Sequence, residues 1–262
     1  MTIIQTIILG IIEGITEFVP ISSTFHLIFS AKILGIAENE FIKLFEVFIQ
    51  SGAILAVVFV FGKRAIRDVD LLKKALVAFL PTAVLGAILY KTIKNTFFES
   101  DYLMAWVFIF VGFLFLIFEW TAKKHNHKIE KGIEGLTYPQ AFLIGILQAL
   151  SFLPGFSRAG AIILSMVILG YKRADSAYFS FVLAVPTMLG AGFFDFIKTY
   201  SSFGISPDQY LQLSAGFIVS FIFAALTIKW FISYLQKHTL NIFGIYRIIA
   251  GTLIVLSLLI LR

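Results

Sequence analysis

The sequence predicts an all-α integral membrane protein, with about six transmembrane helices and two re-entrant helical hairpins in an inverted-topology repeat. Of its 262 residues, 59% are hydrophobic and only 14% are charged, whereas soluble domains carry about 45–50% apolar and about 25% charged residues. So little charge cannot cover so much apolar mass in water, which excludes a soluble, disordered or nucleic-acid-binding chain. The net charge of +6 instead indicates the cytoplasmic excess of Lys and Arg that is common in membrane proteins.

The composition argues against cysteine chemistry, and the N-terminal segment argues against a signal peptide. The chain has no Cys, so we expect no disulfide, thiolate chemistry or Cys-ligated metal. The N-terminus has no basic region, and Glu13 and Glu17 interrupt its apolar stretch before any small-residue cleavage site. We therefore expect no signal peptide.

Each half of the chain is predicted to begin with a helical hairpin that enters the membrane and returns. Thr2–Val19 and Pro139–Leu153 each end at a proline followed by small, polar residues. Ser23–Leu34 and Ala159–Leu169 follow them, and are too short to cross a bilayer, since a span needs about 20 residues. A polar turn survives at membrane depth only where protein or water satisfies its backbone.

Six longer apolar segments are predicted to cross the membrane. They are Phe45–Phe61, Ala75–Leu89, Tyr102–Trp120, Ser176–Phe196, Leu211–Ile232 and Ile242–Leu261. Ala75–Leu89 is short and contains Pro81, but its flanks can extend it.

A repeat relates the two halves of the chain. Glu13 parallels Gln148 at an offset of 135, whereas Ser23 parallels Ser157 after the turn at an offset of 134. We predict a first repeat over residues 1–122, a cytoplasmic linker over 123–137 and a second repeat over 138–262. Each half holds three spans, so the halves lie in opposite orientation, which places a site near the midplane where broken helices meet.

The distribution of Lys and Arg predicts the topology. One side holds thirteen: Lys63, Arg64, Arg67, Lys73, Lys74, Lys123, Lys124, Lys128, Lys131, Lys172, Arg173, Lys229 and Lys237. The other holds six: Lys32, Lys43, Lys91, Lys94, Lys198 and Arg262. The richer side is predicted to be cytoplasmic, so both termini and the mouth of the first hairpin face outward.

Polar residues gather around the first turn. Glu13 and Glu17 share a helix face about 6 Å apart along the axis, so one takes up a proton or a cation sits between them. The simpler alternative is an acid pair in a water-filled vestibule. Ser22, Ser23 and Thr24 can cap the next helix or bind an anion at its N-terminus. His26 lies three residues beyond Ser23, so both can point into one cavity; the alternative is a His that only bonds a neighbouring carbonyl.

The second turn supplies a cation to match. Arg158 is suited to bidentate phosphate binding, beside Ser157 and Gly155, where glycine allows close backbone approach. The two turns together fit a phosphate ester or anhydride held with a divalent cation. Glu46 and Gln50, one turn apart in a span, are predicted to line the same cavity. Arg247, also in an apolar segment, is expected to pair with an acid.

These motifs resemble a known family. The segment 13–26, EGITEFVPISSTFH, is similar to the acidic and SSTGH motif of the undecaprenyl-diphosphate phosphatases, the bacitracin-resistance protein family. The segment 154–161, PGFSRAGA, resembles the family's second motif, PGxSRSxxT. Segments 45–50 (FEVFIQ) and 181–186 (FVLAVP) extend the resemblance to essentially the whole chain. Phe25, Ala159 and Ile162 depart from the pattern, where the family has Gly, Ser and Thr.

The resemblance implies a function. It implies hydrolysis of undecaprenyl diphosphate to undecaprenyl phosphate and inorganic phosphate, with Mg²⁺ or Ca²⁺ as cofactor. It also implies that membrane lipids contact the protein and that the protein forms a homodimer. The expected location is the bacterial plasma (inner) membrane, with the site facing the periplasm or exterior. The catalytic candidates are Glu13, Glu17, Ser23, His26 and Arg158, with Glu13 and Glu17 also as metal ligands. The substrate-binding candidates are Ser22, Thr24, Gly155, Ser157, Glu46 and Gln50.

We expect Ser23 to act as nucleophile with His26 as general base or acid. Direct attack by water, with Ser23 only positioning phosphate, is the alternative. A lipid-phosphate flippase or ion-coupled transporter is the second function compatible with inverted repeats. A prenyl-lipid-binding protein without chemistry is the third.

Overall fold

The computed structural model describes residues 1–96, 100–200 and 206–260, and the side chains of these residues apart from 90–96 and 191–200. The described chain is helical, without a named strand, which confirms the all-α class. The short elements are α1 Ile3–Thr16, α2 Ser23–Ile33, η1 Ile133–Gly135, α6 Tyr138–Gln148, η2 Ala149–Phe152 and α7 Arg158–Ile168. The long elements are α3 Glu40–Arg67, α4 Val69–Thr96, α5 Asp101–Lys124, α8 Arg173–Tyr200, α9 Pro207–Leu235 and α10 Asn241–Ile260.

Each predicted span falls in one of the six long helices, although Leu261, the end of the span predicted over Ile242–Leu261, lies outside the described residues. Within the described residues, α3, α4 up to Leu89, α5, α9 and α10 are long and apolar enough to cross a membrane. The prediction Ser176–Phe196 falls in α8, and its side chains beyond Gly190 lie outside the described residues. The helices run past the apolar windows because they begin where a polar side chain can cap them. Thus Asn39 accepts a hydrogen bond from Ile42 N at 2.9 Å.

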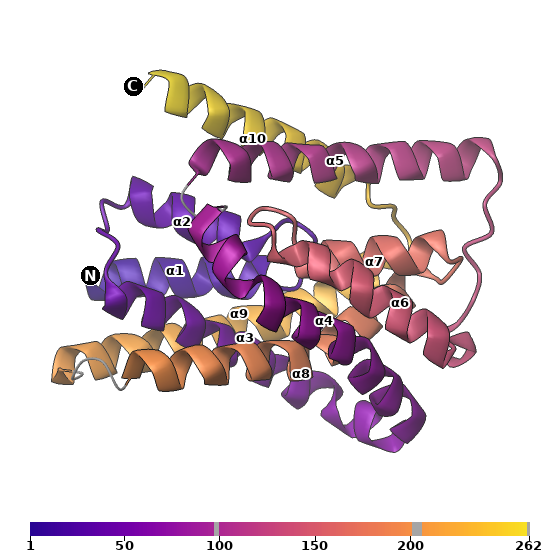
Figure 1. Cartoon of the computed structure of the whole chain (residues 1–262), viewed down its shortest axis with the longest axis horizontal. Helices are drawn as coiled ribbons and strands as arrows, with labels where there is room; N and C mark the ends of the chain where they lie inside the picture. The colour runs from indigo at the N-terminus through magenta and orange to yellow at the C-terminus, as the bar shows by residue number, and fades with distance from the viewer. Residues whose placement is uncertain (97–99, 201–205, 261–262) are drawn as a thin grey trace.

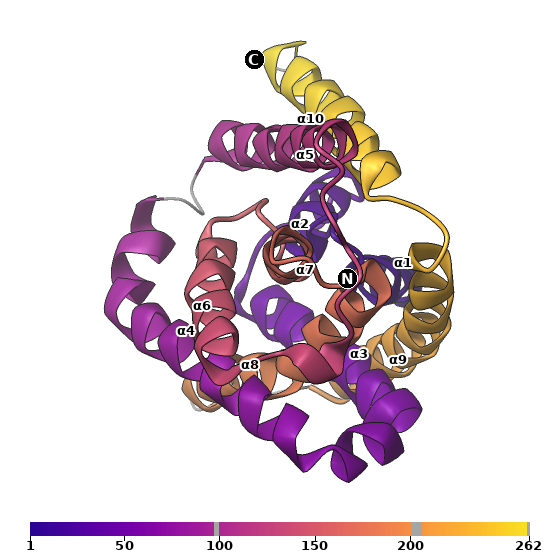
Figure 2. The same cartoon turned by 90° about the vertical axis from the view of Figure 1, so that its right-hand side faces the viewer.

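The four short α-helices form two hairpins that enter from opposite ends of the molecule. Figure 1 shows α1 and α2 at the end that carries both termini, and α6 and α7 at the end that carries the linker after α5. Their turns meet in the middle, beside the long helices. Figure 2 gives the end-on view, in which α5 and α10 form one edge of the bundle. Lys91, Lys94, Lys198 and Arg262 of the charge count have side chains outside the described residues.

The structure changes the repeat register at the turns. Ser22 caps α2 and Ser157 caps α7, and both have positive φ, 63° and 79°. The offset between the two caps is therefore 135, not the 134 expected from the sequence. Ser23 and Arg158 consequently occupy equivalent positions, each as the first residue of the returning helix. Pro20 lies two residues before its cap Ser22, whereas Pro154 lies three residues before Ser157. An alignment on the two prolines is therefore one residue out at the caps.

Small residues fix the depth of both hairpins. A Cβ on Gly14 of α1 would lie 2.6 Å from Ser220 O of α9, and one on Gly145 of α6 would lie 1.9 Å from Ala78 O of α4. Thr82 Oγ1 also donates to Gly145 O at 2.7 Å. Membrane helices associate through such close backbone approach, since lipid provides little hydrophobic drive between them. The turns are thus held firmly in the bundle.

Candidate active site

The two turns bring three predicted residues into direct contact. Ser23 Oγ donates to Glu17 Oε2 at 2.5 Å, and Arg158 Nη2 donates to Glu17 Oε1 at 3.2 Å. Arg158 Nη1 also donates to Ser180 O of α8 at 3.0 Å. Both oxygens of one carboxylate are therefore engaged by the equivalent residues of the two hairpins. Glu17 and Ser23 are buried, with 7% and 8% of their surface exposed.

The two serine caps explain how these side chains are aimed. Ser22 Oγ accepts from Phe25 N at 3.5 Å, and Ser157 Oγ accepts from Gly160 N at 3.2 Å. The capping role that the sequence allowed for Ser22 therefore holds in the structure. Each cap starts a helix whose N-terminus borders the same cavity, and a helix N-terminus favours negative charge.

This cavity has a volume of about 150 Å³ and contains most of the predicted site. The predicted residues that line it are Glu17, Ser22, Ser23, Thr24, Gln50, Gly155, Ser157 and Arg158. The lining residues that sequence reasoning missed are Ser151, Phe152, Leu153, Pro154 and Met188. Pockets that enclose drug-sized ligands measure roughly 300–1,000 Å³, so this one suits a small polar group and not a long lipid.

Glu13 lies outside the cavity lining and is fully buried, one helical turn before Glu17. Neither of its carboxylate oxygens has a hydrogen-bond partner in the part of the chain that the structure describes. A buried carboxylate without partners is costly, so this position calls for a proton, water or a cation. Glu46 is half-buried on α3 and also lies outside the lining. Among the described residues, no three Asp, Glu, His or Cys side chains cluster as a complete metal site.

His26 does not contact Ser23 as we expected. Its Nδ1 lies 2.8 Å from Ser22 O, and its Nε2 lies 2.7 Å from the Tyr246 hydroxyl of α10. The hydroxyl of Ser23 instead donates to Glu17. The expected Ser23–His26 pair is absent because the first turn of α2 aims the two side chains at different neighbours.

Arg247 was expected to pair with an acid, and this expectation is wrong. The fully buried guanidinium binds three backbone carbonyls: Phe108 O at 3.0 Å, Pro20 O at 3.1 Å, and Gly155 O. Pro20 and Gly155 belong to the two turns and Phe108 to α5. Arg247 of α10 therefore ties the two turns to each other. The sequence signals an Arg in an apolar segment but not its partners.

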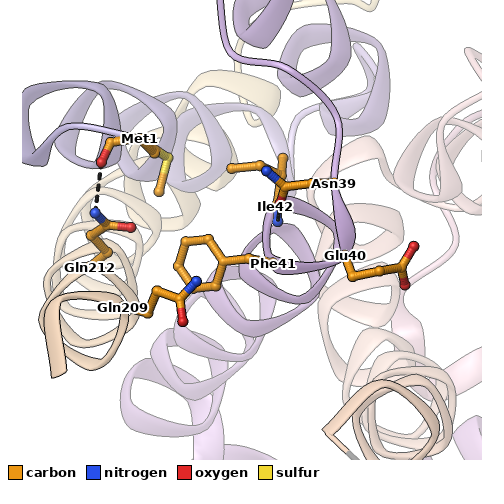
Figure 3. Close-up of a pocket in the computed structure, with 7 residues that line it drawn as sticks. All are labelled: Met1, Asn39, Glu40, Phe41, Ile42, Gln209 and Gln212. Atoms are coloured by element: carbon orange, nitrogen blue, oxygen red, sulfur yellow. Dashed lines mark hydrogen bonds between the residues drawn. The ribbon is translucent and has the colours of Figure 1, made fainter. Parts of the chain in front are cut away.

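A second cavity, of about 380 Å³, lies at the end of the molecule that carries the termini. Figure 3 shows its lining from Met1 and the starts of α3 and α9, with Gln212 Nε2 donating to Met1 O at 2.6 Å. None of the predicted site residues lines it.

Comparison with known proteins identifies the family. Residues 6–253 match the family described as bacitracin resistance protein BacA. The chain belongs to this family. It is 45% identical to a protein of Persephonella marina over 99% of this chain and 100% of the relative. It is 46% identical to one of a Sulfurihydrogenibium species, over 97% and 98%, and 44% identical to one of Aquifex aeolicus, over 96% and 96%. All three are named undecaprenyl-diphosphatase.

The structure shows where the three residues that depart from the motif pattern lie. Phe25 lies inside α2, not at a positive-φ position, and its ring stacks on Phe108 with centroids 3.8 Å apart. Ala159 and Ile162 are fully buried and do not line the cavity. The side chains present at these two positions therefore do not border the cavity.

Proposed function

We propose that this membrane protein hydrolyses undecaprenyl diphosphate to undecaprenyl phosphate and inorganic phosphate, and thereby supports bacitracin resistance. Membership of the family and the names of its relatives support this activity. The observation that carries it is the Glu17 carboxylate, which lies between the Ser23 hydroxyl and the Arg158 guanidinium in a polar cavity. A hydroxyl, a carboxylate and a guanidinium in one cavity supply the positioning and charge stabilisation on which phosphoryl transfer depends.

Ser23 is our candidate nucleophile, with Glu17 as its base. The hydroxyl proton moves along the existing 2.5 Å hydrogen bond to Glu17 as Oγ attacks the terminal phosphorus and the bridging P–O bond breaks. Undecaprenyl phosphate leaves, and water then hydrolyses the phosphoserine to release inorganic phosphate and restore Ser23. The alternative is that Glu17 activates water directly while Ser23 positions the phosphate.

Arg158 is proposed to bind the diphosphate. Its bonds to Glu17 and Ser180 use two of the five N–H donors of a guanidinium. The others suit phosphate oxygens, and the helix N-termini at Ser22 and Ser157 add favourable dipoles. This positive side of the cavity would stabilise the negative charge that develops on the phosphate oxygens in the transition state.

The residues also fit a divalent cation, Mg²⁺ or Ca²⁺. Glu13 has two buried oxygens without a hydrogen-bond partner among the described residues, and it lies one turn before Glu17, the C-cap of α1. Carboxylate oxygens are the ligands that both cations prefer, with phosphate oxygens and water completing the coordination shell. When bound, such an ion neutralises phosphate charge and polarises the phosphorus centre.

The small cavity suits the diphosphate alone, with the prenyl chain outside it in lipid. Phe152, Leu153 and Met188 give the lining an apolar side, which is the side we propose the chain approaches. The poorly basic end of the molecule, with the mouth of the first hairpin, is proposed to face the periplasm or exterior of a bacterial plasma membrane. A homodimer stays a prediction that cross-linking in native membranes would test.

Phosphate release from undecaprenyl diphosphate by the detergent-purified protein, with Mg²⁺ or Ca²⁺, tests the proposal. Glu17→Ala and Arg158→Ala should each abolish turnover in folded protein. Ser165→Ala is the matched control, because its buried hydroxyl only donates to Ala161 O at 2.6 Å within α7. Recovery of undecaprenyl diphosphate intact after incubation with folded wild-type protein would refute hydrolysis and favour transport or binding.

A further inference from the structure

The hydrogen bonds of His26 fix its tautomer. Ser22 O, 2.8 Å from Nδ1, is a carbonyl and can only accept, so Nδ1 must carry a proton. In the neutral ring Nε2 is then an acceptor, and the Tyr246 hydroxyl at 2.7 Å donates to it. The lone pair of the neutral imidazole is thus occupied by a residue of α10 and is not directed at Ser23.

Aromatic contacts hold the ring of His26 in this orientation. It lies nearly parallel to the ring of Tyr246, at 8°, with centroids 5.7 Å apart. The rings of Phe25 and Phe108 make T-shaped contacts with it, at centroid distances of 5.5 and 5.8 Å. The orientation of the imidazole is therefore set by neighbours from three helices, α2, α5 and α10.

The protonated Nδ1 of His26 donates a hydrogen bond to the carbonyl of Ser22, whose backbone is strained. Ser22 has φ 63° and ψ 95°, a conformation that costs a non-glycine residue energy and persists only where its surroundings enforce it. Its carbonyl accepts two bonds from one residue, from the backbone N of His26 at 3.3 Å and from its Nδ1 at 2.8 Å. The next residue is Ser23, whose hydroxyl meets Glu17.

We propose that His26 is a positioning residue, held by the Tyr246 hydroxyl, that fixes the Ser22–Ser23 peptide and so aims Ser23 at Glu17. This role rests on the proposed hydrolysis, and it gives His26 no proton transfer with the substrate. It also names Tyr246, in the last helix of the chain, as a residue on which the geometry of the first turn depends.

Two substitutions separate positioning from acid–base chemistry. His26→Asn keeps an N–H donor that can reach Ser22 O but cannot titrate, whereas His26→Ala removes the donor. We expect His26→Asn to retain turnover within about tenfold of the wild type, and His26→Ala to lose much more, since a hydrogen bond to a strained carbonyl is lost. If folded His26→Asn is as inactive as His26→Ala, the positioning role is overturned.

Tyr246→Phe tests the hydrogen bond between the Tyr246 hydroxyl and His26 Nε2. Tyr246 is 42% exposed, so loss of the hydroxyl should leave the fold intact. We expect kcat to fall about fivefold with KM unchanged, the effect of one hydrogen bond. Tyr102→Phe is the control, because its hydroxyl also bonds α10, at Leu258 O (2.9 Å), away from His26. Equal kcat for Tyr246→Phe and wild type would contradict the proposal.

Nitrogen NMR of ¹⁵N-histidine-labelled protein provides a measurement that does not depend on turnover. We expect His26 in the Nδ1–H tautomer in the wild type, and a shift of its Nε2 resonance in Tyr246→Phe but not in Tyr102→Phe. An Nε2–H tautomer in the wild type would overturn the positioning role whatever the activity. Absence of phosphate release from the wild type, with the expected spectra, would instead count against the proposed hydrolysis alone.

Discussion

Arg247 provides the sharpest test of how the two turns are held together. Replacing it by Met keeps a long apolar stem but removes the guanidinium that binds Phe108 O, Pro20 O and Gly155 O. The two turns then lose a side chain that binds both of them. We expect Arg247→Met to destabilise the fold and to lower turnover even in the fraction that remains folded.

The magnitude follows from the bonds and their cost. A hydrogen bond to a charged group contributes roughly 1.5–3 kcal/mol, and three of them together contribute several kcal/mol. Burial of an unpaired guanidinium offsets part of this, by several kcal/mol. We expect a net loss of about 3 kcal/mol, because Met leaves the turn carbonyls of Pro20 and Gly155 unsatisfied while removing the buried charge; Phe108 O keeps its helical bond within α5.

Equilibrium unfolding of the detergent-solubilised protein measures this loss. Arg247→Lys should be intermediate, since an ammonium keeps the charge but lacks the planar fork that reaches several acceptors. Arg64→Lys is a control on a cation that stacks over Tyr178, 4.1 Å from the ring centroid, far from the turns. If Arg247→Met unfolds at the wild-type denaturant concentration and turns over normally, the reasoning about the turns is refuted.

Three other predictions follow from single contacts. Ser23→Ala should lower phosphate release by at least about a hundredfold if Ser23 is the nucleophile; a loss of less than about tenfold would favour direct attack by water. Glu13→Gln should raise the cation concentration for half-maximal activity about tenfold or more, measured by metal titration, and an unchanged titration would exclude Glu13 as a ligand. Gly145→Ala should destabilise the fold by about 1–3 kcal/mol, because its Cβ would meet Ala78 O. Gly62→Ala, whose Cβ would lie 3.7 Å from its nearest neighbour, should be neutral or slightly stabilising in the same unfolding assay.

The sequence alone predicts the class of fold and most of the site, because both depend on local features. A low charged fraction excludes a soluble surface, and apolar lengths distinguish spans from hairpin arms. Prolines followed by small polar residues mark the turns, and acids, serines and an Arg at those turns mark the site. Eight of the eleven predicted site residues line one cavity, since the turns themselves form it.

Only the tertiary structure determines which groups meet across the turns. The equivalence of Ser23 and Arg158 depends on the backbone conformation of Ser22 and Ser157, and residue spacing does not encode φ. The partner of Ser23 is Glu17, six residues away, and not His26, three residues away, because the orientation of α2 decides between the two and sequence separation does not. The partners of Arg247 are carbonyls up to 227 residues away, and every residue type carries a carbonyl. Long-range polar contacts to backbone leave no pattern in the side chains, so they become visible only once the chain is folded.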